Sequence, residues 1–317
     1  MPKLNIPLIL ITGPTACGKS ALALKLASAF NGAIINADSM QVYRELRILT
    51  ARPTPEQETQ VPHHLYGMIP ALQRFSVAAW LEVVRRTINE VAALGQLPIV
   101  VGGTGLYMTS LVRGLDAMPD IPDVIRREVR DSMARGRVEV AYEQLRAIDP
   151  FAAARVHPHD TQRIARALEV FRATGKSLTE WWQESQSLSL ALPKGWIGLV
   201  LTSSRGWLHD RGARRVERMI AAGAVEEVAT LAALGLDPAL PAMKALGVKP
   251  LMALLQGNIS KNEALEAIKT ATRRYGKRQG TWIKQNMISW QTINSEQLEN
   301  DIDIIFSIIS KKLLTLT

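Results

Sequence analysis

Short apolar runs alternate with helical patterns through the first third of the chain. Residues 75–95 have helical periodicity, with Ser76 as the N-cap and Gly95 as the stop. Because strands that alternate with helices form parallel sheets covered on both faces, we expect an α/β fold. The short runs that we expect to form strands are residues 8–11, which are apolar and typical of a buried strand, then residues 32–39, 63–69, 97–105 and, much later, 195–204.

Arginine-rich helical segments without strands replace this pattern near residue 119. Ile164, Leu168 and Phe171 recur at i, i+4 and i+7, so they predict a buried stripe on one helix, with Arg163 and Arg166 off that stripe. The strand pattern returns at residue 195. We therefore expect a parallel-sheet core, residues 1–118 and 191–317, that is interrupted by an all-helical insertion, residues 119–190.

The last third of the chain is again helical and carries much of the basic charge. In its final segment, Leu298, Ile302, Ile305 and Ile309 fall in helical register. A single apolar stripe of this kind is typical of a terminal helix that docks on the core. We therefore expect C-terminal helices packed on the α/β core.

Composition narrows the class of protein. The 317 residues suit about two domains, or one domain with a large insertion. Apolar runs stay well short of the roughly 20 residues of a membrane span, and the first residues lack the layout of a signal peptide. A single cysteine, Cys17, leaves no internal disulfide or cysteine-rich zinc site. We expect a cytoplasmic protein without membrane contact, and the net charge of +9 favours a polyanionic partner such as nucleic acid.

The motif GPTACGKS follows the first apolar run and precedes strong helix formers. It fits the phosphate-binding pattern G-x-x-x-x-G-K-[ST], in which glycines let backbone N–H groups turn toward phosphate oxygens. Lys19 supplies a full positive charge, and the Ser20 hydroxyl can ligate Mg²⁺. The positive potential should favour a thiolate at Cys17, unless the thiol is buried and inert. The predicted phosphate-binding residues are Gly13, Pro14, Thr15, Ala16, Cys17, Gly18, Lys19 and Ser20.

Two further candidates follow the predicted strands on the same edge of the sheet. Asp38 can place Mg²⁺ through water or act as a general base, or it can cap the next helix. Thr104 lies in the glycine turn of residues 102–105 and can present its hydroxyl to a ligand, unless the segment is only a tight strand–helix turn. The fourth run has no acidic residue of the Walker-B type, which argues against motion coupled to ATP hydrolysis.

An ordered set of motifs identifies a resemblance that extends to about residue 290. The motifs are GPTACGKS, NADSMQVY, TARPT, VPHHL, VGGTGLY, VHPHDTQRIARALEVF, LHDR and KRQGTW. Together they resemble the bacterial tRNA dimethylallyltransferases. The resemblance implies transfer of a dimethylallyl group from dimethylallyl diphosphate to N6 of the adenosine 3′-adjacent to the anticodon. It also implies a Mg²⁺ cofactor, release of pyrophosphate, and an insertion that clasps the tRNA anticodon arm.

The resemblance assigns roles to residues by matching motif. Asp38 is the implied base for the N6 proton, Thr104 orients the reacting groups, and Arg211 contacts the diphosphate. Ser20 helps to place Mg²⁺. The residues in segments matched to tRNA contact are Asp38, Ser39, Met40, Gln41, Thr104, Arg126, Gln162, Arg163, Ile164, Ala165, Arg166, Lys277, Arg278 and Gln279.

The chain departs from the family pattern at two positions. Met40 stands where many members have arginine, and Cys17 stands where many have serine. Two other functions share the phosphate loop: a small-molecule kinase that uses ATP, and an RNA-binding NTPase switch without covalent chemistry. A kinase would not need the basic insertion, and the missing Walker-B acid argues against the switch. We expect a monomeric enzyme.

Overall fold

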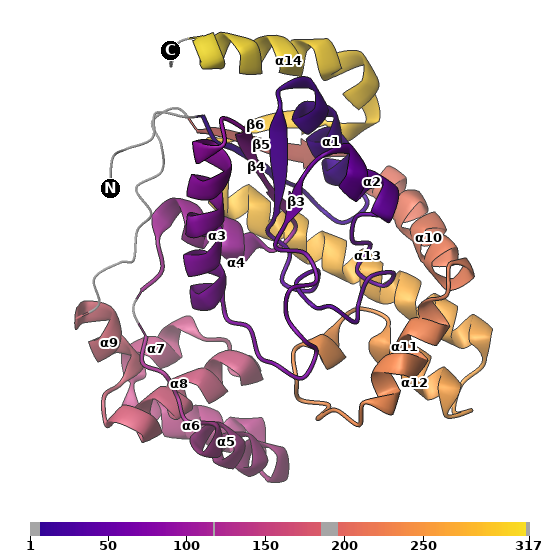
Figure 1. Ribbon diagram of the computed structural model, residues 1–317. Coiled ribbons are helices and arrows are strands. Elements are labelled where there is room, and N and C mark those ends of the chain that lie inside the picture. The colour runs from indigo at the N-terminus through magenta and orange to yellow at the C-terminus, as the bar shows by residue number, and fades with distance from the viewer. Residues whose placement is uncertain (1–6, 117, 185–195, 315–317) are drawn as a thin grey trace. The chain divides into compact units, whose positions relative to one another are not determined.

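The computed structural model describes residues 7–116, 118–184 and 196–314, which fall into two compact units (Figure 1). One unit comprises Met1–Val112 and Leu190–Thr317, and the other comprises Arg113–Ser189. The second unit is therefore an insertion into the first. None of the helices in the described part of the chain is long and apolar enough to cross a membrane.

The first unit contains a six-stranded sheet in the order β3-β2-β4-β1-β5-β6, and all neighbouring strands are parallel. Its central strands are apolar and buried on both faces, as parallel strands covered by helices must be. Their carboxyl ends therefore meet at one edge. The strands are β1 (Ile9–Thr12), β2 (Gly32–Asn36), β3 (His63–His64), β4 (Leu97–Gly102), β5 (Ile197–Thr202) and β6 (Gln291–Asn294).

The strands differ from the sequence-based expectation at three places. β2 ends at Asn36, because the Asn36 amide donates to the carbonyls of Asp38 and Leu65 as the chain turns out of the sheet. β3 has only two residues, so most of the run 63–69 is a turn. β6 was not expected, since Ile293 is its only buried residue. Residue 195, where the fifth strand was expected to start, lies outside the described residues.

Helices cover both faces of the sheet. Side chains of α1 and α14 share one apolar core with five strands, and Ile305 and Ile309 of α14 are buried there. The expectation of a docked terminal helix is thus confirmed. On α3, the Ser76 hydroxyl accepts from the Ala79 N–H, and Gly95 has φ 70° just beyond the helix, as expected for cap and stop. These helices are α1 (Lys19–Ala29), α3 (Val77–Ala93), α4 (Gly105–Arg113) and α14 (Leu298–Leu314).

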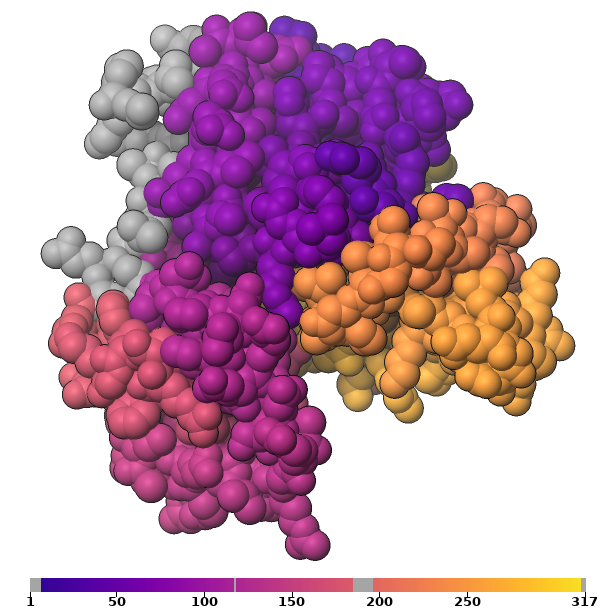
Figure 2. Space-filling model, turned by 60° about the horizontal axis from the view of Figure 1, so that its bottom comes forward, coloured from indigo at the N-terminus to yellow at the C-terminus, as the bar shows by residue number. Residues whose placement is uncertain are grey.

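A second apolar core lies within the same unit. Helices α10–α13 pack there against the segment that follows β2, and Tyr43, Leu46 and Val228 are nearly inaccessible to solvent. Figure 2 shows the outer surface of α11, α12 and the beginning of α13 as one continuous orange area. The remaining helices of the unit are α2 (Pro55–Gln60), α10 (Arg205–Ala221), α11 (Ala224–Ala233), α12 (Val248–Leu255) and α13 (Lys261–Asn286), with short 3-10 turns at Ala242–Lys244 and Ser295–Gln297.

The insertion is all-helical in its described part and has its own core. Ile164 and Leu168 of the expected stripe are buried, whereas Phe171 is half-buried. Asp149 joins two of its helices, because its carboxylate accepts from the Ala152 N–H and from the Thr179 N–H and hydroxyl. Its helices are α5 (Asp123–Arg135), α6 (Val138–Ile148), α7 (Pro150–Arg155), α8 (Thr161–Thr174) and α9 (Leu178–Glu184).

Candidate active site at the carboxyl edge of the sheet

The motif GPTACGKS forms the loop between β1 and α1. Ala16 and Gly18 adopt left-handed conformations, with φ 67° and φ 94°, and these two reversals curl the loop around the first turn of α1. The Lys19 ammonium lies 3.5 Å from the Pro14 carbonyl. Backbone N–H groups, a helix N-terminus and a lysine thus converge at one point, which suits the negative charge of a phosphate group.

A pocket of about 610 Å³ opens beside this loop. Its walls come from Ala16 and Gly18–Ala21, from residues 47–57 and from α10. No Asp or Glu side chain is among the described residues that line it. The pocket therefore suits a polyanion of the size of a diphosphate ester. The cations that line it are Lys19, Arg47, Arg52, Arg211, Arg215 and Arg218.

The arginines of α10 form one wall of the pocket. Arg211 donates from Nε to the Ala16 carbonyl at 3.1 Å, and its guanidinium lies 4.4 Å from the centroid of the Trp207 ring. Arg215 donates to the Thr15 hydroxyl at 3.4 Å. Burial lowers the pKa of Arg215, while the nearby Asp38 charge opposes that shift. Sequence reasoning assigned only Arg211, although Arg211, Arg215 and Arg218 recur at i, i+4 and i+7 and so indicate one face of a helix.

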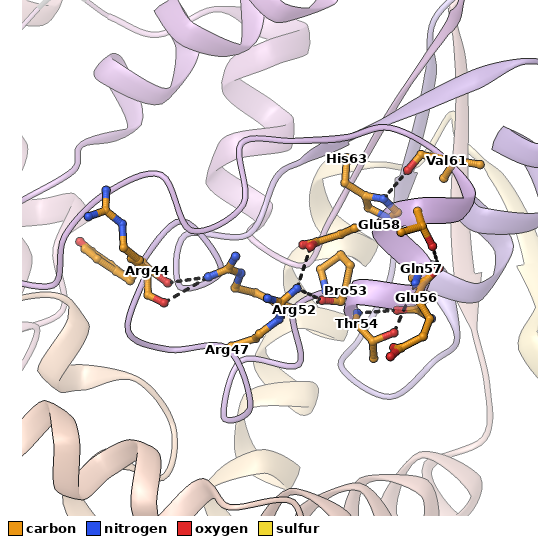
Figure 3. Close-up of polar contacts among 12 residues, drawn as sticks. Arg44, Arg47, Arg52, Pro53, Thr54, Glu56, Gln57, Glu58, Val61 and His63 are labelled. Carbon is orange, nitrogen blue, oxygen red and sulfur yellow. Dashed lines mark hydrogen bonds and ion pairs between the residues drawn. The ribbon is translucent and has the colours of Figure 1, made fainter.

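Residues 47–57 form the facing wall, and Figure 3 shows polar groups of residues 44–63 that hold it. The Arg52 guanidinium donates to the Tyr43 and Arg44 carbonyls, at 3.5 and 3.2 Å. Burial lowers its pKa, and its Nε atom has no hydrogen-bond partner among the described residues. Arg47 donates to the Glu58 carboxylate and the Pro53 carbonyl, each at 2.8 Å. Arg52 belongs to the motif TARPT, but no function was predicted for it from the sequence.

The Glu227 carboxylate of α11 fixes the start of this wall. It accepts the backbone N–H groups of Arg47, Ile48 and Leu49 at 2.7, 2.6 and 2.9 Å. Three consecutive amides around one carboxylate form a charge-assisted anchor. The position of the Arg47 backbone at the pocket therefore depends on a residue that lies 180 positions later in the chain.

Asp38 and Thr104 lie at the same edge of the sheet. The Asp38 carboxylate accepts the Met40 N–H at 2.9 Å, and the chain then continues as turns, so the alternative of a helix N-cap is wrong. The Thr104 hydroxyl accepts the Ser39 N–H at 2.9 Å and lies 3.2 Å from the Ser39 hydroxyl. These bonds hold the two loops together beside the Asp38 carboxylate.

Three tyrosines surround the Asp38 charge. Burial raises the pKa values of Tyr66, Tyr107 and Tyr275, and the negative charge of Asp38 raises each of them further. Their hydroxyls therefore stay protonated at neutral pH. Arg215 is also close enough to Asp38 for the two charges to interact. A carboxylate in this position can accept a proton from a bound molecule.

The structure corrects the expectation for Cys17. The side chain is fully buried in the apolar core beside the sheet, and burial raises the pKa of the thiol despite the opposing charge of Lys19. The predicted thiolate is therefore wrong, and the thiol does not line the pocket. The Thr15 N–H also points inward, to the side-chain oxygen of Gln279 at 2.8 Å. The part of the loop that lines the pocket is Ala16 together with Gly18–Ser20.

The other residues matched to tRNA contact lie in varied settings. Lys277 and Arg278 are exposed on α13, whereas Gln279 is 7% exposed. Met40 packs against the second core, and the Gln41 amide donates to the Thr50 and Ala51 carbonyls. Their contacts with tRNA stay predictions.

The insertion presents only some of its predicted contact residues. Gln162 and Arg163 are exposed on α8, while the side chains of Ile164 and Ala165 are buried in the insertion's own core and are turned away from solvent. Arg126 and Arg166 are half-buried. Arg126 lies 3.5 Å from Asp120, and Arg166 donates to the Pro119 carbonyl at 3.4 Å.

The donor set at the pocket fits Mg²⁺ shared with a substrate. No cluster of three or more His, Cys, Asp or Glu side chains that could enclose a metal occurs among the described residues. The exposed Ser20 hydroxyl, at the first turn of α1, lines the pocket. Because Mg²⁺ retains waters and commonly takes phosphate oxygens together with few protein ligands, Ser20 suits this mode of binding.

Comparisons with known proteins agree on one family. The family described as IPP transferase matches residues 41–286, and the family described as isopentenyl transferase matches residues 6–66. A tRNA dimethylallyltransferase of Parvibaculum lavamentivorans is 48% identical over 92% of each chain. A protein of the same name from Rhizobium etli is 47% identical over 90% of this chain and 96% of its own.

Solved structures resemble the chain over nearly its whole length. The tRNA isopentenylpyrophosphate transferase of Bacillus halodurans has a TM-score of 0.70 and 33% identity, over 98% of this chain and 97% of its own. A eukaryotic dimethylallyltransferase, described as acting on tRNA, has a TM-score of 0.79 and 27% identity, over 98% of this chain and 80% of its own. From family, sequence and structure alike, the chain belongs to the tRNA dimethylallyltransferases.

Proposed function

We propose that this chain transfers a dimethylallyl group from dimethylallyl diphosphate to N6 of the adenosine 3′-adjacent to the anticodon in tRNA, with release of pyrophosphate. The observation that carries the proposal is the pocket beside the phosphate loop, together with the separate carboxylate of Asp38. Among the described residues, six cations and no carboxylate line this pocket. A polyanionic leaving group and a proton acceptor are the two requirements of this reaction. The net charge of +9 and the exposed cations of α13 support a tRNA partner.

The cations of the pocket act on the diphosphate. As the allylic carbon–oxygen bond breaks, negative charge grows on the leaving diphosphate, and Lys19, Arg211 and Arg215 are placed to stabilise that charge. The Ser20 hydroxyl would help to hold Mg²⁺, which would supply further positive charge at the diphosphate. Arg52 lines the same pocket, so its guanidinium adds positive charge near the diphosphate.

Asp38 acts on the acceptor amine. The N6 lone pair of adenine is delocalised into the ring, so the amine is a weak nucleophile. As the new carbon–nitrogen bond forms, the nitrogen becomes cationic and acidic, and the Asp38 carboxylate takes its proton. Thr104 and Ser39 hold the segment that bears this carboxylate.

The activity is tested by product mass. The protein is incubated with Mg²⁺, unmodified tRNA and either dimethylallyl diphosphate or ATP. The tRNA is then digested, and the masses of its nucleosides are measured by mass spectrometry. We expect one five-carbon prenyl unit on adenosine with the first donor and no product with ATP. Phosphate transfer from ATP would instead support the kinase, and ATP-dependent tRNA binding without any product would support the switch.

Asp38→Asn tests the base. The amide keeps an oxygen that can accept the Met40 N–H but lacks basicity, so we predict a rate loss of about 10²–10⁴-fold, the usual range for a positioned acid or base. The measurement is a single-turnover rate at saturating tRNA, diphosphate and Mg²⁺. If excess Mg²⁺ restored the rate, Asp38 would place the metal instead.

Asp237 offers a matched control for Asp38, because it forms the same kind of turn outside the candidate active site. Asp237 also accepts the N–H two residues on, that of Ala239, at 2.7 Å, but it lies in an exposed turn before the 3-10 helix. Asp237→Asn should therefore leave the rate unchanged. A rate of Asp38→Asn within about threefold of wild type would contradict the base assignment, because the usual effect is far larger.

A further inference from the structure

Gln279 lies on the buried side of α13, directly after two exposed cations. Its side chain is 7% exposed, and both ends of its amide are bonded to backbone groups. Its oxygen accepts the Thr15 N–H of the phosphate loop at 2.8 Å, and its nitrogen donates to the Gly103 carbonyl at 2.8 Å. One side chain therefore joins the loop after β1 to the turn after β4.

The turn at Gly103 is shaped around this amide. A Cβ atom at Gly103 would lie 2.3 Å from the nitrogen of Gln279, so only glycine allows so close an approach. Tyr275, one helical turn earlier, also lies beside this turn: burial raises the pKa of its hydroxyl, and the neighbouring side chains of Thr104 and Gln279 oppose that shift. The buried side of α13 thus lies against both Gly103 and Thr104 of the turn.

The same turn continues to the carboxylate. Thr104 follows Gly103, and its hydroxyl accepts the Ser39 N–H at 2.9 Å, next to Asp38. A continuous set of short bonds therefore runs from the phosphate loop through Gln279 and the Gly103–Thr104 turn to the segment of Asp38. Any shift of the Gln279 amide moves one of these parts relative to the other.

We propose that Gln279 is a positioning residue, which fixes the distance between the phosphate loop and the Thr104–Asp38 segment. The inference rests on the proposed function, in which the diphosphate and the accepting base must be held at a set separation. Transfer requires the allylic carbon and the amine in line, and a misplacement of about 1 Å can lower the rate roughly 10²-fold. Because the side chain is only 7% exposed and both ends of its amide are bonded to backbone groups, little of it is accessible to tRNA.

Two variants separate the ends of the amide. Gln279→Met keeps the length of the side chain and removes both bonds, whereas Gln279→Glu at pH 8 keeps the acceptor for the Thr15 N–H and lacks the donor for Gly103. Ile283→Ala is the matched control. Ile283 lies one turn further along α13 and is also 7% exposed, but its side chain forms no hydrogen bond with the phosphate loop or with the Gly103–Thr104 turn. Lys277→Ala removes a charge from the exposed face of the same helix.

Four quantities are measured for each variant: single-turnover rate at saturating substrates, tRNA dissociation constant, pyrophosphate dissociation constant with Mg²⁺, and melting temperature. For Gln279→Met we expect a rate loss of about 10²-fold with tRNA affinity within about threefold, because the loops move apart. Gln279→Glu should also lose rate but keep the pyrophosphate affinity that Gln279→Met loses. Ile283→Ala should lower the melting temperature and keep the rate, and Lys277→Ala should weaken tRNA binding alone.

Two results would overturn the positioning role. One is a Gln279→Met enzyme that regains the wild-type rate at saturating tRNA but binds tRNA more than tenfold weaker, which would make Gln279 a tRNA contact. The other is a rate loss in Ile283→Ala equal to that in Gln279→Met at the same melting temperature. If wild-type protein prenylates no tRNA, the proposed function fails, and the pyrophosphate constants of the two Gln279 variants still decide the positioning role.

Discussion

Cys17 shows at the scale of one residue how burial can outweigh a neighbouring charge. The motif placed the thiol two residues before a lysine, which favours the thiolate. The structure encloses the side chain completely, and loss of hydration has the larger effect, so the pKa rises. The sequence identified the charge because it is local, and missed the enclosure because strands distant in sequence supply it.

This burial predicts a pH dependence of stability. The unfolded thiol ionises near its ordinary pKa of 9.0, whereas the native thiol stays protonated to higher pH. Stability is therefore full below that value and falls as pH rises through the native pKa. Buried tyrosines act with the same sign, so the measurement compares wild type with Cys17→Ala by urea unfolding from pH 7 to 10.5. We expect a shallower decline in the variant, and identical slopes would contradict the assignment.

Other residues of the site divide by the distance of their partners. Lys19, Ser20 and Asp38 could be predicted because a motif and a strand end place them at one edge. Gln279 was matched to tRNA contact, but its bond to the Thr15 N–H could not be predicted, since Thr15 lies 264 residues away. The glycines of the turn predicted a close approach of another group at Gly103. The group that approaches is the Gln279 side chain of α13, and the sequence pattern did not show which side of that helix is buried.

At the scale of elements, periodicity succeeded where burial follows it. α3 and α14 were predicted because each has one apolar stripe, and β1, β2, β4 and β5 because their residues are largely buried on both faces. β6 was missed because an edge strand needs only one buried side chain, Ile293. Hydrogen bonding to β5, rather than an apolar run, defines it.

Glu227 gives a prediction for how one helix holds the pocket wall. Glu227→Gln leaves one side-chain oxygen for three backbone N–H groups, so we expect a loss of about 1–3 kcal/mol in the free energy of unfolding. The wall that carries Arg47 should also loosen, which weakens pyrophosphate binding. Urea unfolding and a pyrophosphate titration measure the two effects.

Glu226→Gln is the matched control for this change. Both glutamates lie in the first turn of α11, so each substitution removes the same favourable charge from the helix N-terminus. Glu226 is exposed and bonds none of the three amides. An equal loss of stability in the two variants would show that the helix terminus, rather than the anchor, is responsible.

At the scale of the whole molecule, the distribution of positive charge predicts that tRNA and the diphosphate bind to surfaces of different extent. The net charge is +9, and the exposed side of α13 carries Arg274, Lys277 and Arg278. The sequence predicted a basic protein with a helical insertion at residues 119–190, and the insertion unit of the structure is Arg113–Ser189. A clasp of tRNA by that unit stays a prediction, because composition gives the charge and not the bound partner.

Salt should therefore weaken tRNA binding far more than pyrophosphate binding. Each phosphate that a cation neutralises releases a counterion, so the slope of log affinity against log salt is about −0.9 per contact for a duplex. Pyrophosphate occupies a small pocket and should show a much smaller slope. Both dissociation constants are measured from 50 to 300 mM KCl, a range of roughly the width that reveals such slopes. Equal slopes would argue against an extended basic tRNA surface.

The place of the insertion has a consequence for the route by which the chain folds. β1 pairs with β5, and Ile9 faces Ile197, so 188 positions separate partners that lie side by side (197 − 9). The entropic cost of closing so large a loop rises with the length of flexible chain within it. If residues 113–189 first condense on their own apolar core, much of that chain is no longer flexible when the strands meet. The insertion would then act as an early folding nucleus for a sheet to which it contributes no strand.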